Sequence, residues 1–230
     1  MKILLINPNS SKDMTENLQE LVSKFPLENI EVDVIGMEDT PKLVNSQETI
    51  DKTFESVKSC IIQNKDKFEM FILACHLDPN LERLRSETNQ VILGIGECSI
   101  LFCKMLGKRF SIIGSSDKTV KLKRNMVDRY GSIGSLDYIG YPEESSNLLV
   151  DKLTRASKSA IDEYDSDAIV LGCAGFVDFD SYIESNIDRD VIDGVIVSLM
   201  IADNYSKYVK YKNKLLKSMN NKWYLEKWFI

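Results

Sequence analysis

Histidine is nearly absent from this 230-residue chain, and its cysteines form no close pair. The single histidine is His76, and none of the five cysteines stands in a C-x-x-C motif. These absences exclude the common structural zinc sites, which need four Cys or His ligands at short spacing. An odd number of cysteines without a secretory signal argues against a disulfide framework and is typical of a reducing compartment. We therefore expect no metal and a cytoplasmic location.

Glycine, proline and positive charge are also scarce. The chain has 11 glycines and 5 prolines, which excludes collagen-like and low-complexity classes. Its net charge is −6, whereas nucleic-acid-binding domains normally carry a basic surface, so we expect no nucleic-acid partner. The first apolar run, Ile3 to Ile6, is too short for a signal-peptide core or a membrane span. We expect neither a targeting peptide nor a membrane partner.

Short apolar bursts alternate with stretches of helical periodicity along the chain. The bursts, which predict strands, span residues 2–6, 30–35, 68–74, 91–95, 110–113, 168–171 and 191–192. The stretches that predict helices span residues 11–25, 46–65, 116–130 and 142–164. This alternation predicts an α/β fold with mostly parallel sheets. Because ligands of such sheets bind beyond the carboxyl ends of the strands, the turns after the bursts are the expected site.

Two cysteines follow predicted strands at the same structural position. Cys75 comes directly after the third burst, and Cys173 follows the sixth. Backbone N–H groups and helix N-termini at such turns stabilise anions, so we expect a lowered thiol pKa at both, with a further contribution from His76 at Cys75. The other three cysteines are interpreted as core residues: Cys60, Cys98 and Cys103.

Two thiols that face one cleft suit a two-base proton transfer. One thiolate removes a proton from a carbon acid and the other thiol returns a proton on the opposite face, which inverts a stereocentre without a cofactor. A redox disulfide and a nucleophilic thiol with a histidine base are the alternatives. A redox pair is more often C-x-x-C, and neighbouring side chains on an extended segment point apart, so His76 is awkwardly placed to serve Cys75.

The turn after the first burst combines a rigid residue with several hydrogen-bonding groups. It reads Asn7-Pro8-Asn9-Ser10-Ser11. Pro8 stiffens the turn, and Asn9, Ser10 or Ser11 caps the following helix. Its free N–H groups and amides are also suited to hold a carboxylate or an imide ring.

Six short segments together resemble the hydantoin and allantoin racemases of the aspartate/glutamate racemase superfamily. They follow the family's order across residues 1–203, and they are Ile3–Ser11 with Met14-Thr15, Ala74–Leu81, Leu93–Glu97, Gly107–Ser111, Leu171–Phe176 and Val191–Val195. The resemblance implies two similar Rossmann-like lobes with parallel sheets and an active-site cleft between them. By position, one lobe would comprise residues 1–97 with 193–230, and the other residues 98–192.

The same resemblance assigns roles to individual residues. It implies one catalytic cysteine from each lobe, Cys75 and Cys173, and no cofactor. Substrate contacts are expected from the first turn, from the segments after the cysteines and from neighbouring turns: Pro8, Asn9, His76, Gly96, Glu97, Ser115, Ala174 and Gly175. Members of the family are oligomeric, which implies a homo-oligomer acting on a small molecule.

The implied reaction is racemisation of a cyclic ureide, a 5-substituted hydantoin or allantoin. Glutamate racemases carry an Asp-x-Ser first turn and a Thr-Asn-Thr after the first cysteine, which this chain lacks, and arylmalonate decarboxylases keep only the second-lobe cysteine. Departures from the family at His76, at Asn80 and at Gly114 to Ser116 surround the site and leave the substrate open. A superfamily isomerase or decarboxylase, an amino-acid racemase and an inactive metabolite-binding homologue remain alternatives.

The C-terminal segment differs in composition from the rest. Residues 204–230 contain seven lysines, one glutamate and both tryptophans, Trp223 and Trp228. The segment thus carries a charge of +6 and the preceding residues −12. This composition indicates an amphipathic helix that packs its aromatic side chains on the body or on a partner subunit; a basic helix on a membrane surface is the alternative.

Overall fold

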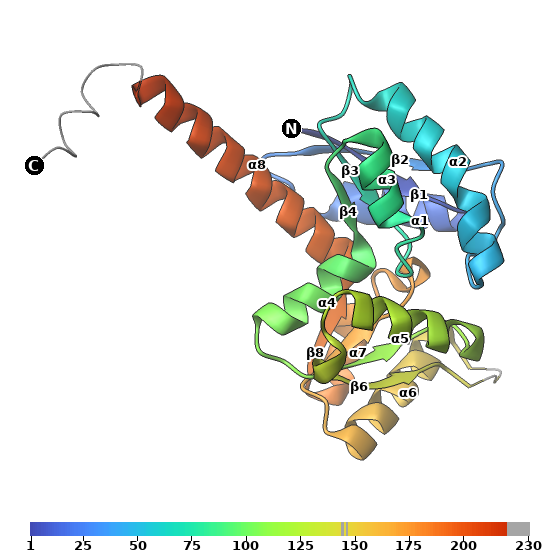
Figure 1. Cartoon of the computed structure of the whole chain (residues 1–230). Coiled ribbons are helices and arrows are strands. Elements are labelled where there is room, and N and C mark those ends of the chain that lie inside the picture. The colour runs from blue at the N-terminus through green and yellow to red at the C-terminus, as the bar shows by residue number, and fades with distance from the viewer. Residues whose placement is uncertain (144, 146, 220–230) are drawn as a thin grey trace, which may run out of the picture.

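Two four-stranded parallel sheets form the two lobes of the molecule (Figure 1). The computed structural model describes residues 1–143, 145 and 147–219. The first sheet has the order β2-β1-β3-β4, from β1 (Lys2–Asn7), β2 (Glu31–Gly36), β3 (Met70–Leu73) and β4 (Ile92–Gly94). The second repeats it as β6-β5-β7-β8, from β5 (Phe110–Ile113), β6 (Leu136–Gly140), β7 (Ala168–Leu171) and β8 (Asp190–Asp193). The predicted two-lobed α/β fold is confirmed.

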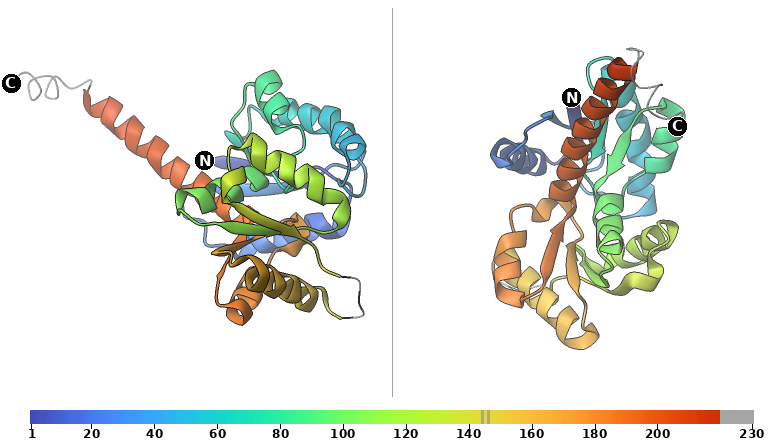
Figure 2. Two further views of the ribbon diagram at one scale, coloured as in Figure 1. Left: turned by 60° about the horizontal axis from the view of Figure 1, so that its bottom comes forward. Right: turned by 90° about the vertical axis from the view of Figure 1, so that its left-hand side faces the viewer.

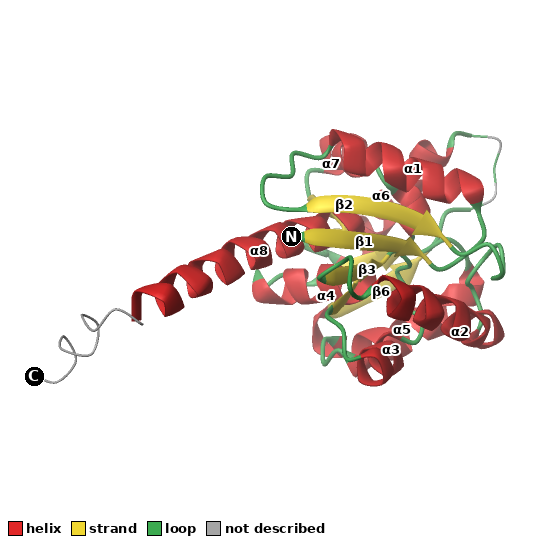
Figure 3. Cartoon of the chain, turned by 90° about the horizontal axis from the view of Figure 1, so that it is seen from above, coloured by secondary structure: helices red, strands yellow, loops and turns green. Residues whose placement is uncertain are grey.

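Helices cover the faces of the sheets (Figure 3). The first lobe has α1 (Lys12–Lys24), α2 (Gln47–Asn64) and α3 (Leu81–Thr88). The second has α5 (Val120–Arg129), α6 (Leu149–Tyr164) and α7 (Asp180–Ile187), with 3-10 turns η1 (Asp117–Thr119), η2 (Ile133–Ser135) and η3 (Ala174–Phe176). The serines that precede α1 and α2 cap them, as Ser11 accepts from the Met14 N–H and Ser46 forms a capping box with Thr49.

Several elements differ from those expected. The helix predicted over residues 142–164 begins only at Leu149, and the one predicted over 116–130 opens with the turn η1. Strand β6 was not expected, because it is an edge strand whose first three residues are only half-buried and which therefore shows no apolar burst. Helices α3, α4 (Ile95–Met105) and α7 were not expected either, and α8 (Gly194–Met219) begins ten residues before the basic segment.

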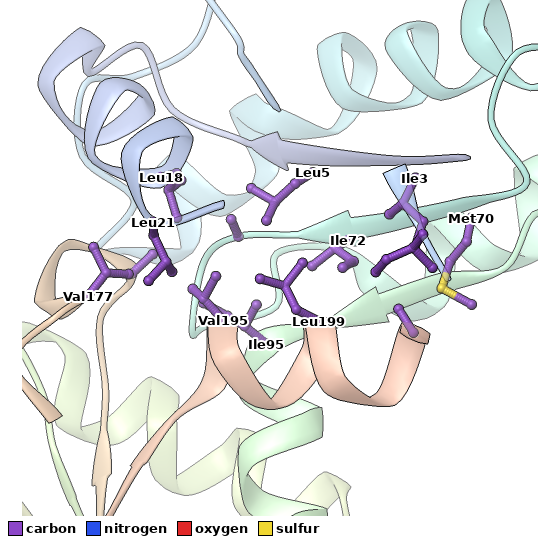
Figure 4. Packing of buried hydrophobic residues seen from close by; sticks show 14 residues of the cluster. Ile3, Leu5, Leu18, Leu21, Met70, Ile72, Ile95, Val177, Val195 and Leu199 are labelled. Atoms are coloured by element: carbon purple, nitrogen blue, oxygen red, sulfur yellow. The ribbon is translucent and has the colours of Figure 1, made fainter. Parts of the chain in front are cut away.

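The helix that leaves each sheet packs on the other lobe. Helix α4 follows the first sheet but buries Ile100 and Cys103 among core residues of the second. Helix α8 follows the second sheet but buries Val195 and Leu199 among core residues of the first, as Figure 4 shows. A Cβ atom at Gly194 would lie 2.4 Å from the Ile95 carbonyl oxygen, so glycine is required where the two helices begin. Each lobe is therefore packed against a helix that follows the sheet of the other lobe, and this helix exchange joins the two lobes.

The predicted lobe boundaries fall within this junction. A boundary after residue 97 lies inside α4, and one after residue 192 lies one residue before the end of β8. The assignment of the C-terminal segment to the first lobe agrees with the Asn29 N–H, which donates to the Asp203 carboxylate of α8 at 2.7 Å. The division itself stays a prediction.

The second half of α8 projects from the body (Figure 2). Its exposed side chains include Tyr205, Tyr208 and Tyr211 among several lysines. Trp223 and Trp228 lie outside the described residues. Within the described ranges, no helix is both long and apolar enough to cross a membrane.

We expect Leu199→Ala to lower the free energy of unfolding by about 2–5 kcal/mol, because Leu199 is fully buried between α8 and the first sheet. The control is Leu101→Ala in α4, whose side chain is 41% exposed and whose loss should cost less than about 0.5 kcal/mol. Urea unfolding of both variants measures the difference. Equal free energies of unfolding for the two variants would show that packing of α8 on the first lobe does not stabilise the fold.

Candidate active site

Cys75 and Cys173 occupy equivalent positions in the two lobes. Cys75 follows β3 and Cys173 follows β7. Each of these strands is the third of its sheet in chain order and an inner strand of that sheet. Each thiol also accepts a hydrogen bond from the backbone N–H two residues further on, Leu77 for Cys75 and Gly175 for Cys173, the latter at 3.4 Å. Both cysteines are free and partly accessible. The repeat of the fold therefore repeats the thiol geometry.

One cavity of about 390 Å³ brings the two thiols together. The first lobe contributes Asn9, Met14, residues 43–45, Ala74, Cys75, His76 and Leu77, and the second contributes residues 115–119, Lys123, Gly172, Cys173 and Ala174. Turn η3, which follows Cys173, packs against the first lobe, since Ala174 and Val177 join the core cluster of Leu18 and Leu21. The cavity thus lies between the carboxyl edges of the two sheets.

Of the residues predicted to contact substrate from the first turn of each lobe, Asn9 and Ser115 line the cavity and Pro8 does not. Asn9 is 4% exposed at the cavity. The Ser11 N–H donates to its Oδ1 at 2.9 Å and holds the side chain in place. Its Nδ2 lies 3.2 Å from the Met14 sulfur. Pro8 is buried and does not line the cavity. The equivalent turn of the second lobe contributes Ser115, which is exposed at the cavity.

Two predicted contact residues lie behind the cavity wall. Gly96 and Glu97, at the start of α4, do not line the cavity. Their N–H groups donate to the carboxylate of Asp78 at 3.0 and 2.6 Å, and the Tyr130 hydroxyl donates to it at 2.7 Å. Glu97 forms an ion pair with Arg85 at 2.5 Å. Asp78 therefore links the loop after β3 to α4 and α5, and burial raises its pKa to about 7.

Of the residues after Cys173, Ala174 lines the cavity, whereas Gly175 supports the thiol. A Cβ atom at Gly175 would lie 3.3 Å from the Met14 methyl carbon and 3.7 Å from the Cys173 sulfur. A side chain there would therefore press on Met14, which lines the cavity.

His76 is a buried, neutral bridge and not a base for Cys75. Its ring is 2% exposed, and burial together with the charge of Lys123 holds its pKa well below the usual value. Nε2 lies 3.3 Å from the Ser99 hydroxyl, and Nδ1 lies 3.3 Å from the Lys123 ammonium. Both ring nitrogens are engaged away from the thiol, so the expectation that His76 lowers the pKa of Cys75 is wrong.

Lys123, in α5, is a cavity residue that the sequence does not predict. It is 1% exposed, and its ammonium donates to the Gly172 carbonyl oxygen at 2.6 Å. Residues 121–124 read as a solvated charged run. The signal that would single out Lys123 is its spacing, since it stands four residues after buried Thr119 and four before buried Val127.

Burial dominates the acidity of both thiols. It raises the pKa of Cys75 to about 12 and raises that of Cys173, although the backbone N–H groups and Lys123 act in the opposite direction. The expected lowering of both pKa values by the turns is therefore wrong in its net sign. Burial also lowers the pKa of Lys123, to about 8. Within the described residues, no three Cys, His, Asp or Glu side chains are grouped to hold a metal ion.

Comparisons with known proteins identify the family and support the fold. The profile of the Asp/Glu/Hydantoin racemase family matches residues 3–202. The hydantoin racemase of Pseudomonas sp. (strain NS671) is 27% identical, over 94% of this chain and 90% of its own length.

Two allantoin racemase structures share the fold. The one from Klebsiella pneumoniae has a TM-score of 0.82 at 22% identity, covering 89% of this chain and 86% of its own. The one from Pseudomonas fluorescens has a TM-score of 0.83 at 21% identity, covering 90% and 92%. With the family match over most of its length, the chain belongs to the Asp/Glu/Hydantoin racemase family.

Proposed function

We propose that this protein is a cofactor-independent racemase of a cyclic ureide, a 5-substituted hydantoin or allantoin. The observation that carries the proposal is the pair of free cysteines, one from the equivalent turn of each sheet, that line one cavity. The names of the hydantoin and allantoin racemases to which the chain is similar support the substrate class. A volume of about 390 Å³ suits a single small ring with a side chain.

In the proposed mechanism, the ring lies between the two thiols. The thiolate of one cysteine takes the proton at C5, and the electron pair left behind delocalises onto the neighbouring carbonyl oxygen. The thiol of the other cysteine then gives its proton to the opposite face of C5. Each turnover leaves the two sulfurs with exchanged roles, so the reverse reaction starts from the other side.

The polar part of the cavity supplies contacts for the ureide. Side chains of Asn9, Asn45 and Ser115 line it and offer amide and hydroxyl groups to the ring N–H and C=O groups. The Asn9 side chain is already held by the Ser11 N–H and the Met14 sulfur, so its contact with the ring requires little reorganisation.

The proposed enzyme has a location and an assembly as well as a reaction. We infer a cytoplasmic enzyme, because its thiols must stay reduced for proton transfer. We also infer a homo-oligomer, supported by the exposed tyrosines on the projecting half of α8: Tyr205, Tyr208 and Tyr211. Size-exclusion chromatography with light scattering measures the subunit number.

We expect Cys75→Ser and Cys173→Ser each to lower kcat/KM by about 10²- to 10⁴-fold, because each removes one of the two acid–base groups. The matched control is Cys60→Ser in α2, which lies outside the cavity and should retain activity. A polarimetric assay over allantoin, alkyl and aryl hydantoins, aspartate and glutamate, against enzyme-free blanks, identifies the substrate. Wild-type rates in either cavity variant would contradict the two-base mechanism.

In deuterated buffer, the product enantiomer should carry deuterium at C5 after a single inversion, because the returning proton comes from a thiol in exchange with solvent. Mass spectrometry and proton NMR of the separated enantiomers measure the label. Inversion with the original hydrogen retained would rule out proton exchange through two thiols.

A further inference from the structure

Lys123 touches both cysteine-bearing turns. Its ammonium donates to the carbonyl of Gly172, the residue before Cys173, and lies 3.3 Å from Nδ1 of His76, the residue after Cys75. An ammonium has three N–H donors. Among the described residues, no further acceptor contacts Lys123, so its third N–H is available to the cavity that the side chain lines.

A buried hydrogen-bond chain fixes the direction of the Lys123–His76 contact. The Ser99 hydroxyl donates to the Gly96 carbonyl oxygen at 3.0 Å. Its oxygen therefore accepts from His76 Nε2–H, which leaves the Nδ1 lone pair to accept from Lys123. Since the imidazole is neutral, the positive charge of the cluster resides on Lys123.

The cavity offers little other charge to balance a thiolate. Asp117 and Lys118 also line it, but both are exposed to solvent. Asp78 does not line the cavity. The Asp193 carboxylate, at the end of β8, repels negative charge on the Cys173 sulfur and so raises the pKa of that thiol. Lys123 is thus the buried cation of the cavity within the described residues, and it acts on both sulfurs.

One buried cation suits one thiolate and not two. One negative sulfur and the ammonium, both in this cavity, sum to zero charge, whereas a second negative sulfur would be uncompensated and would repel the first. The two-base reaction needs this state, with one sulfur charged and the other protonated. We propose that Lys123 is a positioning residue that holds the cavity in the one-thiolate state and lets either Cys75 or Cys173 carry the charge. This inference rests on the proposed function for its purpose, but its test requires no substrate.

The test is the pH dependence of iodoacetamide alkylation at Cys75 and Cys173, followed peptide by peptide by mass spectrometry. In Lys123→Met, we expect the midpoint for the more reactive thiol to rise by at least about one pH unit, so alkylation below the midpoint slows about tenfold. Lys123→Arg should restore most of the reactivity. Lys121→Met, two residues away and exposed, is the control and should match the wild type. An unchanged midpoint in folded Lys123→Met would overturn the proposal.

A second measurement keeps Lys123 and therefore does not depend on how the methionine variant folds. In Cys75→Ser and in Cys173→Ser, the remaining thiol should be alkylated with a midpoint close to that of the wild type, because the ammonium serves whichever sulfur is present. A midpoint more than about one pH unit above that of the same thiol in the wild type, in either variant, would contradict a shared charge. Racemase activity on any substrate is a separate readout, so a failure of the proposed function is distinguishable from a failure here.

Discussion

The close packing of α4 against α8 is the constraint on which the rest of the structure depends. Each helix leaves one sheet and buries its apolar face on the other lobe, and Gly194 lets their first turns meet at the Ile95 carbonyl. Because both helices start at the carboxyl ends of strands, their contact brings the carboxyl edges of both sheets together. The cavity with Cys75 and Cys173 is a consequence of that junction.

The two thiols occupy equivalent positions because the two sheets have the same strand order. Their surroundings differ because different residues follow each cysteine. Each sulfur accepts a backbone N–H two residues on. Around this common geometry the lobes differ, since His76 follows Cys75 while Ala174 follows Cys173. The cavity walls next to the two thiols are therefore chemically distinct.

Burial has two opposing effects on chemistry in this cavity. Removing water raises the thiol pKa values, which works against the charged base that proton abstraction needs. The same exclusion of water strengthens the attraction between a thiolate and the Lys123 ammonium. The neutral His76 and the Ser99 hydroxyl hold that ammonium in place without adding charge. A lysine is therefore tolerated at 1% exposure because its ammonium has hydrogen-bond partners in His76 and the Gly172 carbonyl.

The sequence alone determined the α/β fold, the two strand-end cysteines and the Asn9 turn, because apolar bursts and the residues after them are local patterns. It did not determine β6 or the helices α3, α4 and α7, whose apolar periodicity is weak or short. Only the tertiary structure brought Lys123 into contact with His76 and Gly172, next to the two cysteines in the chain, and engaged both ring nitrogens of His76. It also placed Gly96 and Glu97 outside the cavity lining. These features depend on contacts between α4, α5 and the turn after β3, segments far apart in the chain, and the thiol acidity follows from the burial that those contacts create.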